Sequence, residues 1–150
     1  MPIRVFLNYR RTDDPGHAGW LYERLKAVLP EGDLFMDIDG SSIPLGADFS
    51  CIIDAQVANC DVLLAVIGPH WLSRLRERAT ESQDFVVLEI ESALRQQKLV
   101  VPVLVGDTPM PRAEQLPARI RDLAYRNGQN LPNAHFRVLV EDFIQRLVKH

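Results

Sequence analysis

Short apolar runs alternate along the chain with longer segments in which apolar residues recur every three or four positions. The short runs are typical of parallel strands that are covered on both faces, and the longer segments are typical of amphipathic helices. Their alternation predicts repeated βα units and a parallel sheet. The predicted strands cover residues 3–7, 34–38, 62–67 and 99–105, with a further candidate around residues 130–131.

The segments between the strands carry the start signals of helices. An acidic residue that can cap the first turn, or a proline that fits it, precedes several of them. The predicted starts are Asp14-Pro15, Asp48, Asp84 and Phe136, and a further helix is expected over residues 118–125. Because Pro102 removes a backbone donor, the fourth strand should contain an unpaired or irregular stretch. Five strands with such crossovers fit the flavodoxin-like order 2-1-3-4-5, with helices on both faces of the sheet.

The composition is that of one ordinary globular domain. The 150 residues have the length of a single domain, and the hydrophobic content of 47% is typical of soluble proteins. No run approaches the roughly 20 apolar residues that cross a membrane. The net charge of −3 lacks the basic excess that sequence-independent nucleic-acid binding uses. We therefore expect residues 1–150 to form one domain with neither a membrane nor a nucleic acid as its partner.

The cysteines and the first residues favour a reducing, cytoplasmic environment. Cys51 and Cys60 are too few for a disulfide framework, and we expect both to be small buried apolar residues. The segment that begins at Met1 runs directly into a predicted strand, without the basic, apolar and small-residue order of a signal peptide.

Several common chemistries lack their motifs. The glycines form neither a dinucleotide-binding G-x-G-x-x-G nor a P-loop, and no G-x-S-x-G motif is present. The histidines and cysteines do not have zinc-site spacing, so no metal is expected. A receiver domain would need acidic residues after the first strand, where this chain has Asn8, Tyr9 and Arg10.

Candidate binding residues follow the first two predicted strands, since ligands of doubly wound sheets bind beyond the carboxyl ends of the strands. Tyr9, Arg10 and Arg11 follow the first strand. Arginine pairs with phosphate oxygens and tyrosine offers a stacking face, although surface charge and an aromatic that caps the core would explain the same residues. The loop over residues 39–46 is either a lid or docking surface, or simply a well-packed loop.

Two glutamates flank the apolar stripe of the predicted third helix. Glu91 has Arg95 four residues later, the favourable order for a helical ion pair. Glu89 has no cation at the corresponding positions and follows Phe85 by one turn. At the edge of a cleft such a carboxylate is a candidate for chemistry, and the alternative is an exposed glutamate without a special role.

Four segments in order along the chain resemble motifs of the Toll/interleukin-1 receptor (TIR) domain family, particularly of its bacterial members. The apolar run that ends in Asn8-Tyr9-Arg10 resembles the first-strand motif. Residues 35–39 with 43–46 are similar to the second strand and the BB loop, residues 60–69 to the third strand and its exit, and residues 84–94 to the helix that carries the catalytic glutamate of NAD-cleaving members.

This resemblance implies cleavage of the bond between nicotinamide and ribose in NAD+, giving nicotinamide and ADP-ribose or a cyclic form, in bacterial defence or signalling. It implies no cofactor or metal, NAD+ being the substrate. It also implies self-association, because the family completes its active sites with the BB loop of a neighbouring copy. The implied roles are catalysis by Glu89, substrate contacts by Tyr9, Arg10, Asp39, Ile43 and Phe85, and BB-loop contacts by Pro44, Leu45 and Gly46.

The chain departs from the family pattern at two positions. Phe85 stands where many active members have tryptophan, and Asn8 replaces the usual serine. Two alternatives to the enzyme stay open. One is a non-catalytic TIR module that acts through homotypic contacts, and the other is nucleoside transfer on a related α/β fold.

Overall fold

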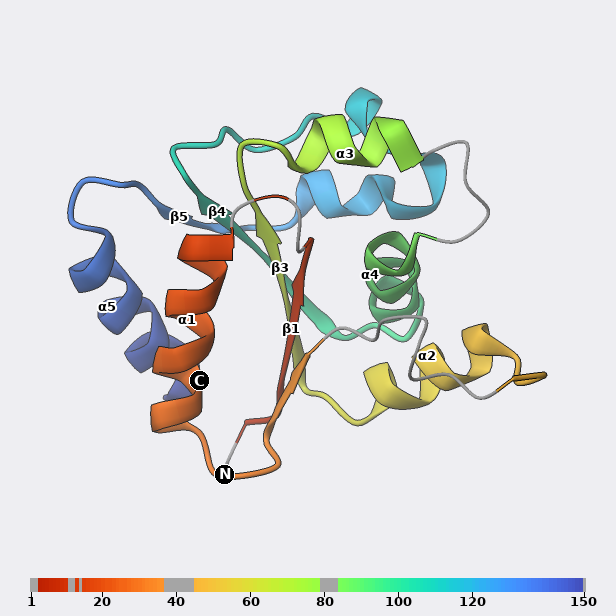
Figure 1. Cartoon of the computed structure of the whole chain (residues 1–150), viewed down its shortest axis with the longest axis horizontal. Coiled ribbons are helices and arrows are strands. Elements are labelled where there is room, and N and C mark those ends of the chain that lie inside the picture. The colour runs from red at the N-terminus through yellow and green to blue at the C-terminus, as the bar shows by residue number, and fades with distance from the viewer. Residues whose placement is uncertain (1–2, 11–12, 14, 37–44, 79–83, 150) are drawn as a thin grey trace.

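The computed structural model describes residues 3–10, 13, 15–36, 45–78 and 84–149. Within them a five-stranded parallel sheet has the order β2-β1-β3-β4-β5 (Figure 1), which confirms the predicted flavodoxin-like topology. The strands are β1 (Val5–Tyr9), β2 (Leu34–Met36), β3 (Val62–Ile67), β4 (Leu99–Val105) and β5 (Gln129–Leu131).

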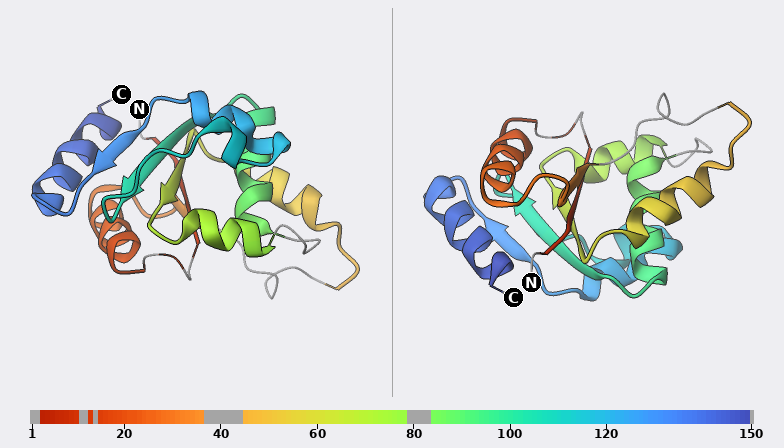
Figure 2. Two further views of the ribbon diagram at one scale, coloured as in Figure 1. Left: turned by 90° about the horizontal axis from the view of Figure 1, so that it is seen from above. Right: turned by 90° about the horizontal axis from the view of Figure 1, so that it is seen from below.

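Helices cover both faces of this sheet, as Figures 1 and 2 show. One face carries α1 (Pro15–Val28) and α5 (Phe136–Val148). The other face carries the remaining helices, which are α2 (Phe49–Ala58), α3 (Trp71–Arg78), α4 (Phe85–Arg95) and the 3₁₀ helices η2 (Ala113–Gln115) and η3 (Ala118–Tyr125). No helix of the described residues is both long and apolar enough to span a bilayer.

Two separate apolar layers follow from the alternation of side chains along each strand. Phe6 and Leu63 face α2, α4 and η3, whereas Leu7 and Leu64 face α1 and α5, and all four are fully buried. The six residues of β3 are all buried, as expected for a central strand covered on both sides. A continuous apolar run therefore marks a strand that is buried on both faces. The apolar runs of β3 and β4 end where these strands end, so their bounds are as predicted.

The first strand is displaced from its prediction. It spans Val5–Tyr9 and not residues 3–7, because its ladder with β3 runs from Val5 beside Val62 to Tyr9 beside Val66. Pairing with a central strand thus carries the polar Asn8 into the sheet. The described part of β2 ends at Met36, and the predicted positions 37–38 lie outside the described residues.

The helices that were predicted begin at the expected positions, but not all of the predicted capping hydrogen bonds form. Pro15 begins α1, while Asp14 lies outside the described residues. The carboxylate of Asp48 accepts a hydrogen bond from the Ser50 backbone at 3.0 Å, which confirms this cap. Asp84 holds the N-cap position of α4, but its side chain makes no capping hydrogen bond, so that expectation of capping chemistry is wrong.

Strand β4 runs unbroken through Pro102. This residue pairs in register with Ala65 of β3, and the pairing with β5 begins one residue later at Val103. The proline therefore lies where β4 has no ladder partner among the described residues on its β5 side, and this one-sided gap in the pairing is the unpaired stretch predicted for the strand. Gly128 approaches it closely there, since a Cβ at Gly128 would lie 2.7 Å from the Pro102 carbonyl oxygen.

The two cysteines differ in environment. Cys60 is buried as predicted, and burial raises the pKa of its thiol. Cys51 is exposed, which corrects the expectation that both are buried. It lies in the first turn of α2 with its Sγ 3.5 Å from Asp48, because the apolar face of that helix is carried by Ile53 and Val57.

Candidate functional site

The end of β1 and the helix α4 bring an amide and a carboxylate together inside the protein. The Nδ2 group of Asn8 donates to Oε1 of Glu89 at 2.8 Å and to the Val86 carbonyl at 3.2 Å. Both side chains have no solvent-exposed surface. Glu89 is therefore not an ordinary exposed glutamate, and one of the two interpretations of its sequence position is excluded.

The Asn8 amide is oriented as a hydrogen-bond donor toward Glu89. Turning the amide over would place its oxygen against two acceptors, the Val86 carbonyl and the Glu89 oxygen. In the observed orientation Oδ1 is buried without a hydrogen-bond partner among the described residues. Asn8 thus supplies a donor to Glu89 and retains one unused acceptor.

A second buried polar pair lies beside this one. Arg10 follows β1 and donates from both terminal nitrogens to the two carboxylate oxygens of Asp84, at 3.1 and 2.8 Å. The two side chains are only 3% and 5% exposed. Arg10 is therefore not a surface charge, and its guanidinium is already occupied by a carboxylate at the start of α4. Arg11 lies outside the described residues.

The two aromatic candidates, Phe85 and Tyr9, belong to the apolar layers on opposite faces of the sheet. Phe85 packs edge to face on Phe49 of α2, with ring centroids 5.9 Å apart, on the same face as Glu89. Tyr9 is half-buried and packs against the layer formed with α1 and α5. Because successive strand side chains point to opposite faces, Tyr9 and Asn8 are directed to opposite sides of β1.

Only the end of the predicted BB loop is described. Leu45 is completely exposed, and Gly46 adopts a positive φ of 83°, a conformation that favours glycine. Asp39, Ile43 and Pro44 lie outside the described residues. The structure therefore presents one exposed apolar side chain at this loop and leaves its predicted substrate contacts untested.

Asp13 is a structural residue of this edge that the sequence analysis missed. Its carboxylate accepts hydrogen bonds from the backbone of Gly68 and of His70, each at 2.7 Å. These two residues form the exit of β3 and lead into α3, a helix that was also not predicted. Trp71 and Leu75, one turn apart and both buried, were the available signal for α3.

The predicted helical ion pair on α4 does not form. Arg95 pairs with Asp54 of α2, which also accepts from the Ser92 hydroxyl at 2.6 Å. Glu91 is left half-buried two residues from Glu89. Because α2 packs on α4, the carboxylate of Asp54 takes the place of Glu91 as the partner of Arg95. A rule about spacing within one helix could not predict this contact. No group of three or more potential metal ligands occurs among the residues that the structure describes.

Comparisons with known proteins agree with this architecture. The family model described as "TIR domain" matches residues 5–140. Two solved structures share the fold at low identity: the TIR domains of the activated Roq1 resistosome that recognises the pathogen effector XopQ (17% identity, TM-score 0.61, 97% of this chain and 99% of that chain), and a prokaryotic SEFIR domain (14%, 0.60, 99% and 93%). No curated protein matches the chain. The family match spans most of the sequence, and the chain belongs to the TIR domain family.

Proposed function

We propose that this TIR domain is an NAD+ glycohydrolase with Glu89 as its catalytic carboxylate. The observation that carries the proposal is the buried contact of Glu89 with Asn8, at the carboxyl edge of the sheet where doubly wound folds bind their ligands. A fully buried carboxylate is costly unless a function or a network retains it. We place this activity in bacterial defence or signalling, in the cytoplasm, with residues 1–150 acting as a single domain.

One carboxylate suffices for the proposed chemistry. The bond between C1′ of the ribose and the pyridinium nitrogen breaks with its electron pair going to nitrogen, so nicotinamide leaves neutral and needs no proton. Glycosidases use a second carboxyl group because an alcohol leaving group must be protonated. Glu89 would stabilise the oxocarbenium-like transition state, and water would then add to C1′ and lose a proton. Intramolecular attack would instead give the cyclic product.

The structure supports the remaining predicted substrate contacts to different degrees. Phe85 shares its face of the sheet and could stack on a ring of NAD+. Arg10 would bind the pyrophosphate only after exchanging Asp84 for it, because both of its terminal nitrogens are engaged. Tyr9, Asp39 and Ile43 are carried into the proposal by the family resemblance alone.

Activity should depend on self-association. With no exposed surface, Glu89 is inaccessible to NAD+ until the surrounding residues rearrange. Leu45 exposes its whole side chain beside Gly46, and with Pro44 it would form the contact that a neighbouring copy receives. We propose that this contact both opens and completes the site. Binding of a second copy would supply the free energy for the rearrangement.

The experiment is a measurement of nicotinamide release over a wide range of protein concentration. Glu89→Gln keeps the side-chain shape and an acceptor for Asn8, and should abolish turnover. Glu91→Gln removes the same charge from the same helix and should retain it. Leu45→Asp should lower turnover at intermediate concentration by preventing association. Full activity in Glu89→Gln would refute the assignment.

The burial of Glu89 and the pairing of Arg10 also favour the second candidate, a non-catalytic module that acts through homotypic TIR contacts. In that case both polar pairs only hold β1 to α4. The module would release no nicotinamide under assembling conditions, while Leu45→Asp would still abolish its association. The same concentration series therefore separates the two candidates.

A further inference from the structure

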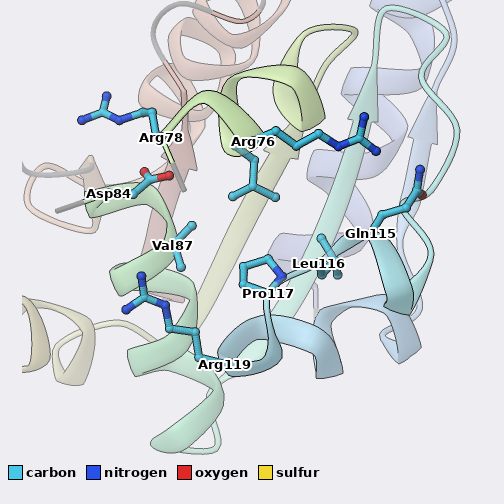
Figure 3. Close-up of a pocket in the computed structure, with 9 residues that line it drawn as sticks. Arg76, Arg78, Asp84, Val87, Gln115, Leu116, Pro117 and Arg119 are labelled. Atoms are coloured by element: carbon cyan, nitrogen blue, oxygen red, sulfur yellow. The ribbon is translucent and has the colours of Figure 1, made fainter. Parts of the chain in front are cut away.

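A pocket of about 280 Å³ opens on the face of the sheet that carries α2, α3 and α4. It lies between α3, the first turns of α4 and the segment that joins η2 to η3. Figure 3 shows the side chains that line it. They come from three parts of the chain that are distant in sequence, and are Leu75, Arg76, Arg78, Asp84, Val87, Gln115, Leu116, Pro117 and Arg119.

The lining combines an apolar base with cations. Leu75, Val87 and Leu116 are buried and supply aliphatic surface, to which Pro117 adds a ring. Arg76 and Arg119 are exposed and enter from different elements; in Figure 3, Pro117 and Leu116 lie between them. An apolar base with a few polar groups at its margin is the usual construction of a small-molecule site.

The charge at this pocket is unbalanced. Two exposed arginines, Arg76 and Arg119, line it, and the acid among its described lining residues is Asp84, whose two carboxylate oxygens already accept from Arg10. Among the described residues no acidic side chain forms an ion pair with Arg76 or Arg119. This excess of positive charge occurs in a chain whose net charge is −3. The local field therefore favours an anion, although the whole protein does not.

The pocket is separate from the contact between Asn8 and Glu89. Val87 lines the pocket and Glu89 is two residues later, so the two side chains point in nearly opposite directions from α4 at about 100° per residue. Among the described residues, Asp84 lies between the two sites, because it lines the pocket and pairs with Arg10 beside the contact of Asn8 with Glu89. Occupation of one site therefore does not require the other.

We propose that this pocket binds a small organic anion, a molecule with an apolar body of about one ring and a phosphate or carboxylate group. The volume of about 280 Å³ lies just below the range of about 300–1,000 Å³ for drug-sized ligands, which fits a smaller molecule with one ring and one anionic group. Arginine is suited to either group because its planar fork pairs with two oxygens. The aliphatic base selects the apolar body, and the arginine at either margin, Arg76 or Arg119, pairs with the anionic group.

The test follows the methyl resonances of Leu75, Val87 and Leu116 in the whole chain during titration with four probes in the absence of NAD+. Phenyl phosphate and benzoate carry both chemical features, inorganic phosphate carries only the charge, and phenol only the ring. We expect saturable shifts with phenyl phosphate or benzoate, and the tighter of the two identifies the preferred anionic group. The proposal is wrong if no probe saturates at millimolar concentration, or if inorganic phosphate or phenol binds as tightly as phenyl phosphate.

Matched variants locate the binding. Arg76→Gln with Arg119→Gln should weaken phenyl phosphate about tenfold or more, because the phosphate then loses its charge-assisted contact at whichever margin of the pocket it occupies. Arg126 is exposed at the end of η3, outside the pocket, so Arg126→Gln should change the affinity for phenyl phosphate by less than about twofold. Unchanged affinity in the double variant, with its methyl spectrum intact, would overturn the proposal. The measurement uses binding alone, so its outcome is independent of turnover at Glu89.

Discussion

Breaking the buried pair of Arg10 and Asp84 should destabilise this domain strongly. Removing one partner of a buried ion pair leaves an uncompensated charge and costs about 3–5 kcal/mol. The pair is almost entirely enclosed and has two hydrogen bonds, so Asp84→Asn should fall in this range. Stabilities of native proteins are about 5–15 kcal/mol, and the loss would be a large share of the total.

Urea unfolding measures this effect directly. With an m value of about 2 kcal/mol/M, a loss of 4 kcal/mol lowers the midpoint by about 2 M. The matched control is Glu77→Gln, which breaks the exposed pair with Arg74, whose side chains are 42% and 61% exposed. Exposed pairs contribute about 0–1 kcal/mol, so this midpoint should move by less than about 0.5 M.

A double-mutant cycle tests the cause. Arg10→Met alone leaves the Asp84 carboxylate buried and should also destabilise strongly, whereas Arg10→Met with Asp84→Asn leaves no buried charge. The double variant should therefore lose much less than the sum of the single losses. Losses that add to within about 0.5 kcal/mol would refute the reasoning, because the two side chains would then act independently.

Three further predictions concern other parts of the fold. Gly128→Ala should lower stability by about 1–3 kcal/mol in urea unfolding, since its Cβ would meet the Pro102 carbonyl; an unchanged midpoint would contradict this contact. Hydrogen bonds from Arg4, chiefly from its backbone N–H, lower the pKa of Asp61, so its stabilisation is present at neutral pH and is lost as pH falls through that pKa. The melting temperatures of the wild type and Asp61→Asn should accordingly differ at pH 7 and converge near pH 2. Trp71→Ala should cost about 3–5 kcal/mol, because the indole is fully buried, and a smaller loss would show that α3 contributes little to the core.

The elements that the sequence predicted well are those whose burial is set by the sheet itself. Strands β3 and β4 lie near its centre, so their apolar runs end where their pairing ends. Strand β1 was placed two residues too early because Asn8 and Tyr9 are polar or amphipathic, yet they pair with β3. The helix α3 was missed because only Trp71 and Leu75 are buried in an otherwise charged segment.

The polar contacts were less predictable, because their partners are distant along the chain. Glu89 was singled out from its local sequence, but its donor is Asn8, 81 residues away. Arg10 was recognised as a positive charge at the correct edge of the sheet, and its partner Asp84 is 74 residues away. Asp84 itself was assigned to helix capping, a local role that its side chain does not perform. Spacing rules describe contacts within one helix or strand, and these contacts join different elements.

The distribution of buried polar groups gives the strongest reason to assign a function to this edge of the sheet. Six polar or charged residues are buried among those that the structure describes. Five of them lie at or just beyond the carboxyl end of β1, or between the N-cap and the second turn of α4; these are Asn8, Arg10, Asp13, Asp84 and Glu89. The sixth, Ser92, lies farther along α4. An apolar core would stabilise the fold at lower desolvation cost than such charges do. Natural sequences depart from the rules of stable packing mainly at functional or strained sites. If these residues served stability alone, apolar replacement of both members of a pair would be tolerated in every assay; if they serve a site, the same replacement should keep the fold and abolish either turnover or assembly.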